Sequence, residues 1–411
     1  MHDDLMILGK DRYYSLDCYQ TKVNNNVLVV GTAGSGKTRS IVTPNLLQAT
    51  GSYIVSDPKG NLYNKYGKYL EEKGYVVKKL DFTNPSDSVH YNFFEYIRTP
   101  LDCIKLANML IYSQQAARMN DPFWEEATQL LVQSLLGFLW EGEPEGGRNY
   151  YGLMRLLDMC LSGIAADPGQ KSRLDVLMGR LEATLPDSFA AKSYAKFRVA
   201  ADKTLRSILI TANARLGRFE TPELNEMMSS DDVNITSIGQ RKTALFVVVS
   251  DTDRSLDGLA NIFFTQAMNE LVTYADRHCE NNCLPVPVRF LLDDFATNCK
   301  ICEFPRMISS IRSRGISVML FIQAESQLRE GYGEDAKTII GNCDTYVYLG
   351  GNDIETARSV AERCDLPLTT VLNMPVETNW IFRRGQEPAN GRNFELEPFL
   401  KEKLESENLS R

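Results

Sequence analysis

Near the amino terminus, segments with the hydrophobic pattern of strands alternate with segments that have the hydrophobic spacing of helices. Short β-branched or aromatic runs at 27–30, 53–55 and 75–80 are separated by apolar residues at helical spacing after Gly36 and from Leu62. Strands and helices in this alternation predict a βαβαβ unit with a parallel sheet. The residues before Val23 carry no readable pattern.

The pattern then changes to helix alone. From 99 to 237 the strand signal disappears, and the segment 123–140 carries apolar residues one helical turn apart. Strands are expected again at 244–249, 288–292, 318–322 and 346–349, with helices near 259–274, 304–313 and 354–364. We therefore predict an α/β fold, a sheet with helices on both faces and an inserted all-α domain, divided as 1–98, 99–237 and 238–411.

A glycine-rich segment follows the first predicted strand. Gly31-Thr-Ala-Gly-Ser-Gly-Lys37-Thr38 fits G-x-x-x-x-G-K-[ST] and lies between a strand and a helix, as a phosphate-binding P-loop does. Lys37 can then reach the β and γ phosphates, and Thr38 can ligate Mg²⁺. The predicted ligands are ATP and Mg²⁺, and the predicted contacts are Gly31, Thr32, Ala33, Gly34, Ser35, Gly36, Lys37, Thr38, Arg39 and Asp57.

The segment Arg289-Phe-Leu-Leu-Asp293-Asp294 is the candidate for the acidic motif that accompanies a P-loop. Such a site needs a carboxylate at the end of a buried strand to complete the magnesium shell. Asp293 is predicted to fill that role with Thr38, and Asp294 to be the general base that activates the attacking water. An ordinary acidic strand end is the alternative.

Asp57 and Gln323 are candidates of a weaker kind. Asp57 follows the second strand, at the edge of the sheet where open α/β folds bind ligands. It is also explained as the N-cap of a helix that starts at Pro58, and both roles can hold at once. Gln323 follows the strand 318–322 and could sense the γ-phosphate or position water, with a plain polar strand end as the alternative.

Several arginines could contact phosphate. Arg312 and Arg314 lie between a helix and the strand 318–322, where either could reach a neighbouring subunit's nucleotide as an arginine finger, or be a solvated surface residue. A second basic stretch comprises Lys203, Arg206, Arg215 and Arg218. Its side chains could contact phosphate or could form a solvated helix face, and the sequence favours neither alternative.

Charge and composition narrow the function classes. The formal net charge of −8 argues against a surface that binds nucleic acid everywhere, so any DNA contact must be local. The longest apolar runs have the length of strands and are far shorter than the roughly 20 residues that cross a bilayer. Together with nine irregularly spaced cysteines and no visible signal peptide, this predicts a cytoplasmic chain with reduced thiols.

Two cysteine pairs superficially resemble a zinc ribbon. Cys279 and Cys283 precede the predicted strand 288–292, and Cys299 and Cys302 follow it. Five extended residues at about 3.3 Å each would hold the pairs at opposite ends of that strand. A zinc ion shared by both pairs is therefore disfavoured.

These motifs together resemble the conjugative DNA-transfer coupling ATPases of type IV secretion systems. The resemblance covers most of the chain. It rests on Gly31 to Thr38, Ser56-Asp-Pro-Lys-Gly60, Asp121-Pro-Phe-Trp124, Leu291-Leu-Asp-Asp-Phe-Ala296, Ile311-Arg-Ser-Arg-Gly-Ile316, Ile340-Gly-Asn-Cys-Asp344 and Leu349-Gly-Gly-Asn-Asp353.

The resemblance implies a RecA-like motor with an inserted helical domain, assembled as a hexameric ring. Such a ring brings single-stranded, relaxase-bound DNA or protein substrates to a secretion channel, with relaxosome and channel proteins as partners. Members of the family are normally anchored in the inner membrane by N-terminal helices, which this sequence does not show. We therefore expect a truncated soluble piece at the cytoplasmic face of that membrane, or an anchorless relative.

The sequence departs from the family at the acidic motif. Asp293-Asp294 stands where the family usually has Asp-Glu, and Cys299 and Cys302 stand in place of a Gly and a Pro. A base one methylene shorter can misplace the attacking water, and about 1 Å of misplacement can cost on the order of a hundredfold in rate. Slow hydrolysis is therefore expected.

Three functions stay open at this point. The first is an ATPase that translocates DNA or nucleoprotein through a hexamer. The second is a recruitment platform that binds ATP but hydrolyses little of it. The third is a duplex-DNA pump, which should lack the segment from Asp121 to Trp124.

Overall fold

The computed structural model describes residues 4–112, 122–142, 147–166 and 171–408. Contacts divide the chain into two compact units. The first comprises Met1–Lys79, Ile235–Asp251 and Met268–Arg411, and the second comprises Leu80–Asn234 and Thr252–Ala267. These units differ from the predicted division, because they assign 80–98 and 252–267 to the second unit. The predicted boundaries at 98/99 and 237/238 stay a prediction.

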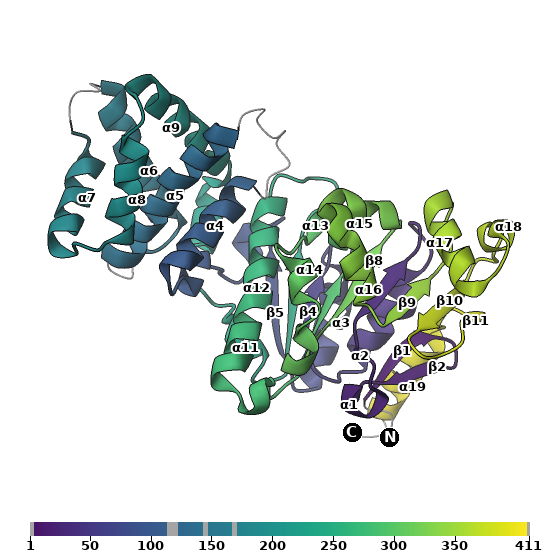
Figure 1. Ribbon diagram of the computed structural model, residues 1–411. Helices are drawn as coiled ribbons and strands as arrows, with labels where there is room; N and C mark the ends of the chain where they lie inside the picture. Colours follow the sequence, from purple (N-terminus) through teal and green to yellow (C-terminus); the bar gives the residue numbers. More distant parts are fainter. Residues whose placement is uncertain (1–3, 113–121, 143–146, 167–170, 409–411) are drawn as a thin grey trace. The chain divides into compact units, whose positions relative to one another are not determined.

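The first unit is built on one sheet, shown in Figure 1. Within the described residues its strand order is β11-β10-β9-β3-β8-β7-β4-β6-β5. The strands are β3 (Val27–Val30), β4 (Ser52–Ser56), β5 (Val76–Asp81), β6 (Thr243–Val248), β7 (Val288–Leu292), β8 (Ile316–Ile322), β9 (Thr345–Tyr348), β10 (Thr378–Arg383) and β11 (Ala389–Arg392). The run from β9 to β6 is parallel throughout.

Helices cover both faces of this sheet. In Figure 1, α14 (Phe304–Met307) and α16 (Ala336–Gly341) lie in front of it, and α2 (Thr43–Leu47) and α3 (Asn61–Glu72) lie behind it. Every residue of β3, β4, β6 and β7 is consequently buried, as is usual for parallel strands. The remaining helices of the unit are α1 (Cys18–Thr21), α11 (Ile235–Ile238), α13 (Phe295–Asn298), α15 (Glu325–Tyr332), α17 (Ile354–Cys364), α18 (Leu368–Leu372) and α19 (Leu396–Asn408). The predicted α/β class is confirmed.

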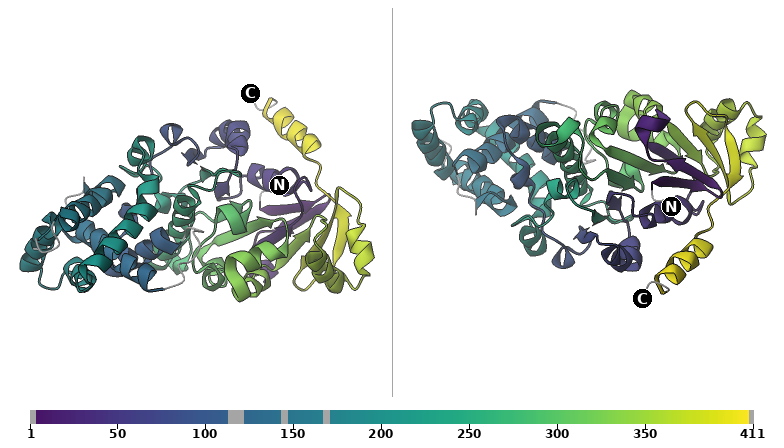
Figure 2. Two further views of the ribbon diagram at one scale, coloured as in Figure 1. Left: turned by 90° about the horizontal axis from the view of Figure 1, so that it is seen from above. Right: turned by 90° about the horizontal axis from the view of Figure 1, so that it is seen from below.

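Two hairpins were not predicted. Strands β1 (Leu5–Gly9) and β2 (Arg12–Ser15) form one, held to α2 because Asn45 exchanges hydrogen bonds with the backbone of Ile7. Strands β10 and β11 form the other and extend the sheet antiparallel to β9 (Figure 1; Figure 2). Polar Asn379 and Arg383 occupy two of the buried positions of β10, so the alternation is hidden in the sequence.

The single helix expected over 304–313 is wrong. α14 ends at Met307, and a separate 3₁₀ turn covers Ile311–Arg314. Between them, the hydroxyls of Ser309 and Ser310 donate to the backbone carbonyls of Arg306 and Met307. Serine hydroxyls that bond locally to the backbone compete with a continuous helix.

Apart from the last two residues of β5, the regular elements in the described part of the second unit are helices. It contains α4 (Pro100–Tyr112), α5 (Pro122–Gly142), α6 (Tyr150–Ala166), α7 (Arg173–Thr184), α8 (Phe189–Arg198), α9 (Asp202–Leu216) and α10 (Pro222–Met227), while α12 (Asp257–His278) runs through both units. Helix α5 packs against α8 at Gly137, where a Cβ would lie 2.9 Å from the ring of Phe189. In the family segment, Pro122 begins α5, and Asp121 lies outside the described residues.

Arg215 fits neither alternative offered for the basic stretch. It is buried, its guanidinium lies 3.3 Å from the carboxylate of Glu125, and it also donates to the carbonyl of Ile111. The other members of the stretch, Lys203, Arg206 and Arg218, are exposed. In the described ranges of the chain, no helix combines the length and the apolar character needed to cross a membrane.

The buried Glu125–Arg215 pair predicts a large asymmetry between neighbouring carboxylates. Glu125→Ala should lower the free energy of unfolding by about 3–5 kcal/mol, because it leaves a buried guanidinium uncompensated. Glu126→Ala, at an exposed position of the same helix, should change it by less than about 0.5 kcal/mol. Urea unfolding followed by circular dichroism measures both, and equal effects would contradict the assignment.

Candidate nucleotide-binding site

The glycine-rich loop stands at the centre of the sheet. It follows β3, which lies between β8 and β9 with all three parallel. Its first amide, Gly31 N–H, donates to the carbonyl of Ile322 at the end of β8 (3.1 Å), and Leu349 N–H donates to the carbonyl of Val30 (2.8 Å). The loop therefore starts at the carboxyl edge, where open α/β sheets bind ligands.

The glycines of the loop are conformationally required. Gly34 and Gly36 have φ of +78° and +93°, in the left-handed region that other residues avoid. A Cβ on Gly31 would lie 2.5 Å from the hydroxyl of Ser35. After Gly36 the chain enters a π-helical turn, Thr38–Val42, which continues into α2. This is the strand–loop–helix arrangement expected of a P-loop.

Lys37 turns back into the loop. Its ammonium donates to the carbonyls of Gly31 (2.6 Å) and Thr32 (3.2 Å), and its side chain is buried. Burial lowers the pKa of Lys37, while the nearby charges of Asp293 and Asp294 act in the opposite direction. A phosphate group would supply the anion that this buried cation lacks within the loop itself.

Two serine hydroxyls at the loop also fit an anion. The Oγ atoms of Ser35 and Ser40 are buried and have no hydrogen-bond partner among the described residues. Buried hydroxyls normally find a partner, so each is a donor that a bound phosphate could satisfy. The residues present therefore fit a nucleotide's phosphates.

Asp293 and Thr38 face each other across the edge of the sheet. The Thr38 hydroxyl donates to Asp293 Oδ2 (3.3 Å), and the Ser56 hydroxyl donates to the backbone carbonyl of Asp293 (3.2 Å). Burial raises the pKa of Asp293, and the charge of Asp294 raises it further. A hydroxyl and a carboxylate oxygen are hard donors of the kind that Mg²⁺ takes, so the pair fits that ion.

Asp294 and Gln323 come together beside this pair. Asp294 has a φ of +49° at the start of α13, a left-handed conformation that aspartate tolerates better than most residues. The amide nitrogen of Gln323 lies 3.5 Å from Asp294 Oδ1, and Gln323 N–H donates to the side-chain oxygen of Gln327 (2.7 Å). Three predicted residues, Asp293, Asp294 and Gln323, thus share one edge with the loop.

Asp57 is engaged with the helix that follows it. The helix starts at Asn61 rather than Pro58, with Gly60 at its N-cap position in the left-handed conformation. Asp57 nevertheless accepts a hydrogen bond from the N–H of Tyr63 (2.9 Å), inside the first turn. Burial raises the pKa of Asp57, and the backbone N–H groups lower it in part. A role of Asp57 toward nucleotide stays a prediction.

Arg312 and Arg314 are not part of this group. They precede β8, whereas the loop follows β3, which is parallel to it, so they lie at the opposite edge of the sheet. Seven residues of β8 span about 20 Å. Arg312 donates to the carbonyl of Cys18 (2.7 Å), and Arg314 pairs with Asp276 (2.9 Å). A contribution to a neighbouring subunit's site stays a prediction.

The sequence reasoning missed the carboxyl-terminal wall of the loop. The guanidinium of Arg39 pairs with Glu377 (2.8 Å), and the Asn393 amide donates to the carbonyl of Ser35 (3.4 Å). Asn393 N–H also donates to the carbonyl of Glu377 (2.8 Å). Both residues flank the unpredicted β10–β11 hairpin, so recognising that hairpin would have been the only route to them.

These features define a P-loop NTPase site on a RecA-like α/β sheet. The sequence profile described as type IV secretory system conjugative DNA transfer matches residues 4–367. The chain therefore belongs to that family, which confirms the resemblance drawn from the motifs.

Individual relatives are distant and longer. The chain is similar to the type IV secretion system-coupling protein VirD4 of Bartonella henselae, with 21% identity over 81% of this chain and 52% of that protein. It is also similar to the protein VirD4 of Rhizobium radiobacter (25%, 82% and 47%) and to the conjugal transfer protein TraG of Escherichia coli (23%, 86% and 57%). The chain thus spans about half the length of the curated relatives it matches.

Solved structures share the fold. The bacterial conjugative coupling protein TrwBdeltaN70 superposes with a TM-score of 0.70 at 17% identity, over 95% of this chain and 88% of that one. The plasmid coupling protein TrwB in complex with ADP and Mg²⁺ gives a TM-score of 0.64 at 18% identity, over 90% and 86% of the two chains.

The raised pKa of Asp293 predicts that its ionised form lowers the stability of the nucleotide-free fold. Because burial favours the neutral form, the ionised carboxylate destabilises the nucleotide-free fold above the ordinary pKa of 3.8. Asp293→Asn should therefore raise the melting temperature near neutral pH, and the gain should shrink as the pH falls toward 3.8. Calorimetric melting at several pH values tests this, and a variant less stable at pH 7 would contradict it.

Proposed function

We propose that this chain is the ATP-hydrolysing motor part of a coupling protein in a type IV secretion system. One observation carries the proposal: Lys37, Thr38 and Asp293 converge at the carboxyl edge of a RecA-like sheet, in a chain that belongs to a conjugative DNA transfer family. The structures of TrwB solved with ADP and Mg²⁺ and with the ATP analogue ADPNP support ATP and Mg²⁺ as ligands.

Each residue has a defined task in this proposal. The backbone amides of the loop and the Lys37 ammonium bind the β and γ phosphates, with Lys37 leaving the carbonyls of Gly31 and Thr32. Thr38 and Asp293 hold Mg²⁺, which would offset the charge of the phosphates. Asp294 takes a proton from the attacking water, and Gln323 orients that water or the γ-phosphate.

The larger setting is proposed from the relatives. Proteins named for coupling and for conjugal transfer share most of this chain, so we place it with single-stranded, relaxase-bound DNA or protein substrates at the cytoplasmic face of the membrane that carries the secretion channel. A homohexameric ring would surround the DNA or protein substrate that the motor moves. Because the chain is acidic overall, DNA contacts would be confined to a local lining of such a ring.

A recruitment platform is the second candidate, and Asp294 favours it. The carboxylate is one methylene shorter than a glutamate, and its oxygen lies 3.5 Å from the amide of Gln323. A base held short of the attacking water would leave binding intact while slowing turnover. In this alternative, bound ATP would promote assembly and substrate recruitment without driving translocation.

Steady-state hydrolysis separates the two candidates. Turnover of the parent chain should rise with protein concentration and with single-stranded DNA, and it should vanish in Lys37→Ala. Asp294→Glu should accelerate it by up to about a hundredfold, because the longer side chain reaches further toward the water. Lys65→Ala, an exposed lysine on α3, is the matched control and should leave turnover unchanged.

Mass measured alongside the assay reports whether a ring has formed. Assembled chains that bind ATP and never hydrolyse it, except as Asp294→Glu, would replace the motor by the platform. Turnover that survives in Lys37→Ala would contradict both candidates.

A further inference from the structure

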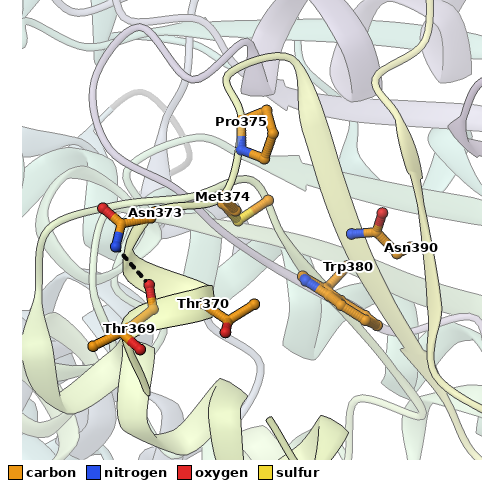
Figure 3. Close-up of a pocket in the computed structure, with 7 residues that line it drawn as sticks. All are labelled: Thr369, Thr370, Asn373, Met374, Pro375, Trp380 and Asn390. Carbon is orange, nitrogen blue, oxygen red and sulfur yellow. Dashed lines mark hydrogen bonds between the residues drawn. The ribbon is translucent and has the colours of Figure 1, made fainter. Parts of the chain in front are cut away.

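Two asparagine side chains are buried at the carboxyl-terminal hairpin. Buried and half-buried residues alternate along β10, so Asn379, which is 1% exposed, faces the interior. Trp380 points to the other face and lines a groove there together with Asn390 (Figure 3). Asn393 directly follows β11 and is 6% exposed. Because buried amides normally have hydrogen-bond partners, the role of Asn379 and Asn393 lies in what they contact.

The topology brings Asn393 to the edge of the sheet that carries the P-loop. Strand β9 runs parallel to β3, so both strands end at the carboxyl edge. Strand β10 is antiparallel to β9, and β11 is antiparallel to β10, so β11 ends at that edge as well. The residue that follows β11 is therefore at the same edge as the loop that follows β3.

The side chain of Asn393 contacts the P-loop at a single peptide group. Its amide nitrogen donates to the carbonyl of Ser35 (3.4 Å) and lies 3.7 Å from the Cβ position of Gly36. The Ser35–Gly36 peptide is trans and planar, so its C=O and N–H point in opposite directions. A carbonyl held toward Asn393 consequently directs Gly36 N–H to the other side of the peptide.

The N–H group of Gly36 is available to a bound phosphate. It donates to no group in the described part of the chain, whereas Ser35 N–H and Ser40 N–H donate to carbonyls of the loop (3.1 and 2.7 Å). Backbone N–H groups of a glycine-rich loop are the donors that hold phosphate oxygens. The contact with Asn393 therefore orients a phosphate donor although Asn393 itself is directed at the opposite end of the peptide.

Asn379 determines which end of the Asn393 amide faces the loop. The amide nitrogen of Asn379 donates to Asn393 Oδ1 (3.1 Å) and to the carbonyl of Arg392 (3.2 Å). Because an amide nitrogen donates and does not accept, the oxygen of Asn393 has to face Asn379, which leaves its nitrogen for Ser35. Asn393 N–H also donates to the carbonyl of Glu377 (2.8 Å), so the backbone of Asn393 is held as well.

We propose that Asn393 is a positioning residue of the P-loop, which holds the Ser35 carbonyl so that Gly36 N–H faces the bound phosphates, and that Asn379 sets the orientation of its amide. The inference rests on the proposed function, because it presupposes phosphate in the loop. It gives the carboxyl-terminal hairpin a part in nucleotide binding, through residues that lie outside the G-x-x-x-x-G-K-[ST] motif.

Isothermal calorimetry in the presence of Mg²⁺, with ATP and with inorganic tripolyphosphate, tests the proposal. Asn393→Ala should weaken the binding of both ligands by about threefold to tenfold, the size expected for one neutral hydrogen bond. The two losses should be equal, because both ligands bind through their phosphates. Asn390→Ala is the matched control, since the Asn390 amide donates to the carbonyl of Asn379 (3.3 Å) in the same hairpin, and it should leave both affinities unchanged.

Steady-state hydrolysis gives a second readout that a merely structural role would not move. In Asn393→Ala the KM for ATP should rise by the same factor as the dissociation constant, while kcat stays near that of the parent. Gly36 N–H contacts phosphate in the ground state as well as in the transition state, and loss of such uniform binding affects KM alone.

A double-mutant cycle tests the role of Asn379. Asn379→Ala should weaken the binding of both ligands about twofold or more, because the Asn393 amide loses the partner that orients it. In an Asn393→Ala background the same substitution should have no further effect, since Asn379 acts through Asn393. Urea unfolding of each variant without ligand shows whether the chain is folded under the conditions of the binding assay.

The outcomes separate this proposal from the function on which it rests. A folded Asn393→Ala that binds both ligands like the parent would overturn the positioning role and leave the P-loop function standing. Effects of Asn379→Ala and Asn393→Ala that simply add would overturn it too. A folded parent that binds neither ATP nor tripolyphosphate would overturn both proposals. If Asn393→Ala does not fold, a folded Asn379→Ala with the affinity of the parent contradicts the positioning role.

Discussion

The candidate site depends on the parallel packing of β3 between β8 and β9. Parallel strands end at a common edge, and here that edge carries the glycine-rich loop after β3, Gln323 after β8 and the two aspartates after β7. Because the strands are buried on both faces, their register fixes these ends relative to one another. The geometry of the candidate site therefore depends on hydrophobic packing well away from the site itself.

Charge is concentrated at this edge at a cost to the nucleotide-free fold. Lys37 is held by two carbonyl oxygens, and burial together with the charge of Asp294 raises the pKa of Asp293. A ligand that carries phosphates and a divalent cation compensates both groups at once. Nucleotide binding should consequently stabilise the chain, since whatever binds only the folded state raises its stability.

The parts of the fold that could be predicted from the sequence are those with a continuous apolar pattern or a motif of fixed spacing. Strands β3, β4, β6 and β7 are buried runs of mostly apolar residues, and the P-loop and the Asp293–Asp294 pair have fixed spacings. The β10–β11 hairpin was not predicted because Asn379 and Arg383 occupy two of the three buried positions of β10, so the pattern of β10 does not look amphipathic. The partners that hold Arg312, Arg314 and Arg215 escaped because they come from distant parts of the chain, which no local pattern reports.

The central claim is that Lys37, Thr38 and Asp293 form one site for nucleotide and Mg²⁺. The most direct measurement is the affinity of the parent chain for ATP with Mg²⁺ and with the ion chelated, by equilibrium titration. The account predicts saturable binding that weakens when Mg²⁺ is removed, and much less dependence on Mg²⁺ in Thr38→Val, which keeps the loop but loses the hydroxyl ligand. Affinity that is indifferent to Mg²⁺ in the parent, or the absence of binding by a folded chain, would contradict it.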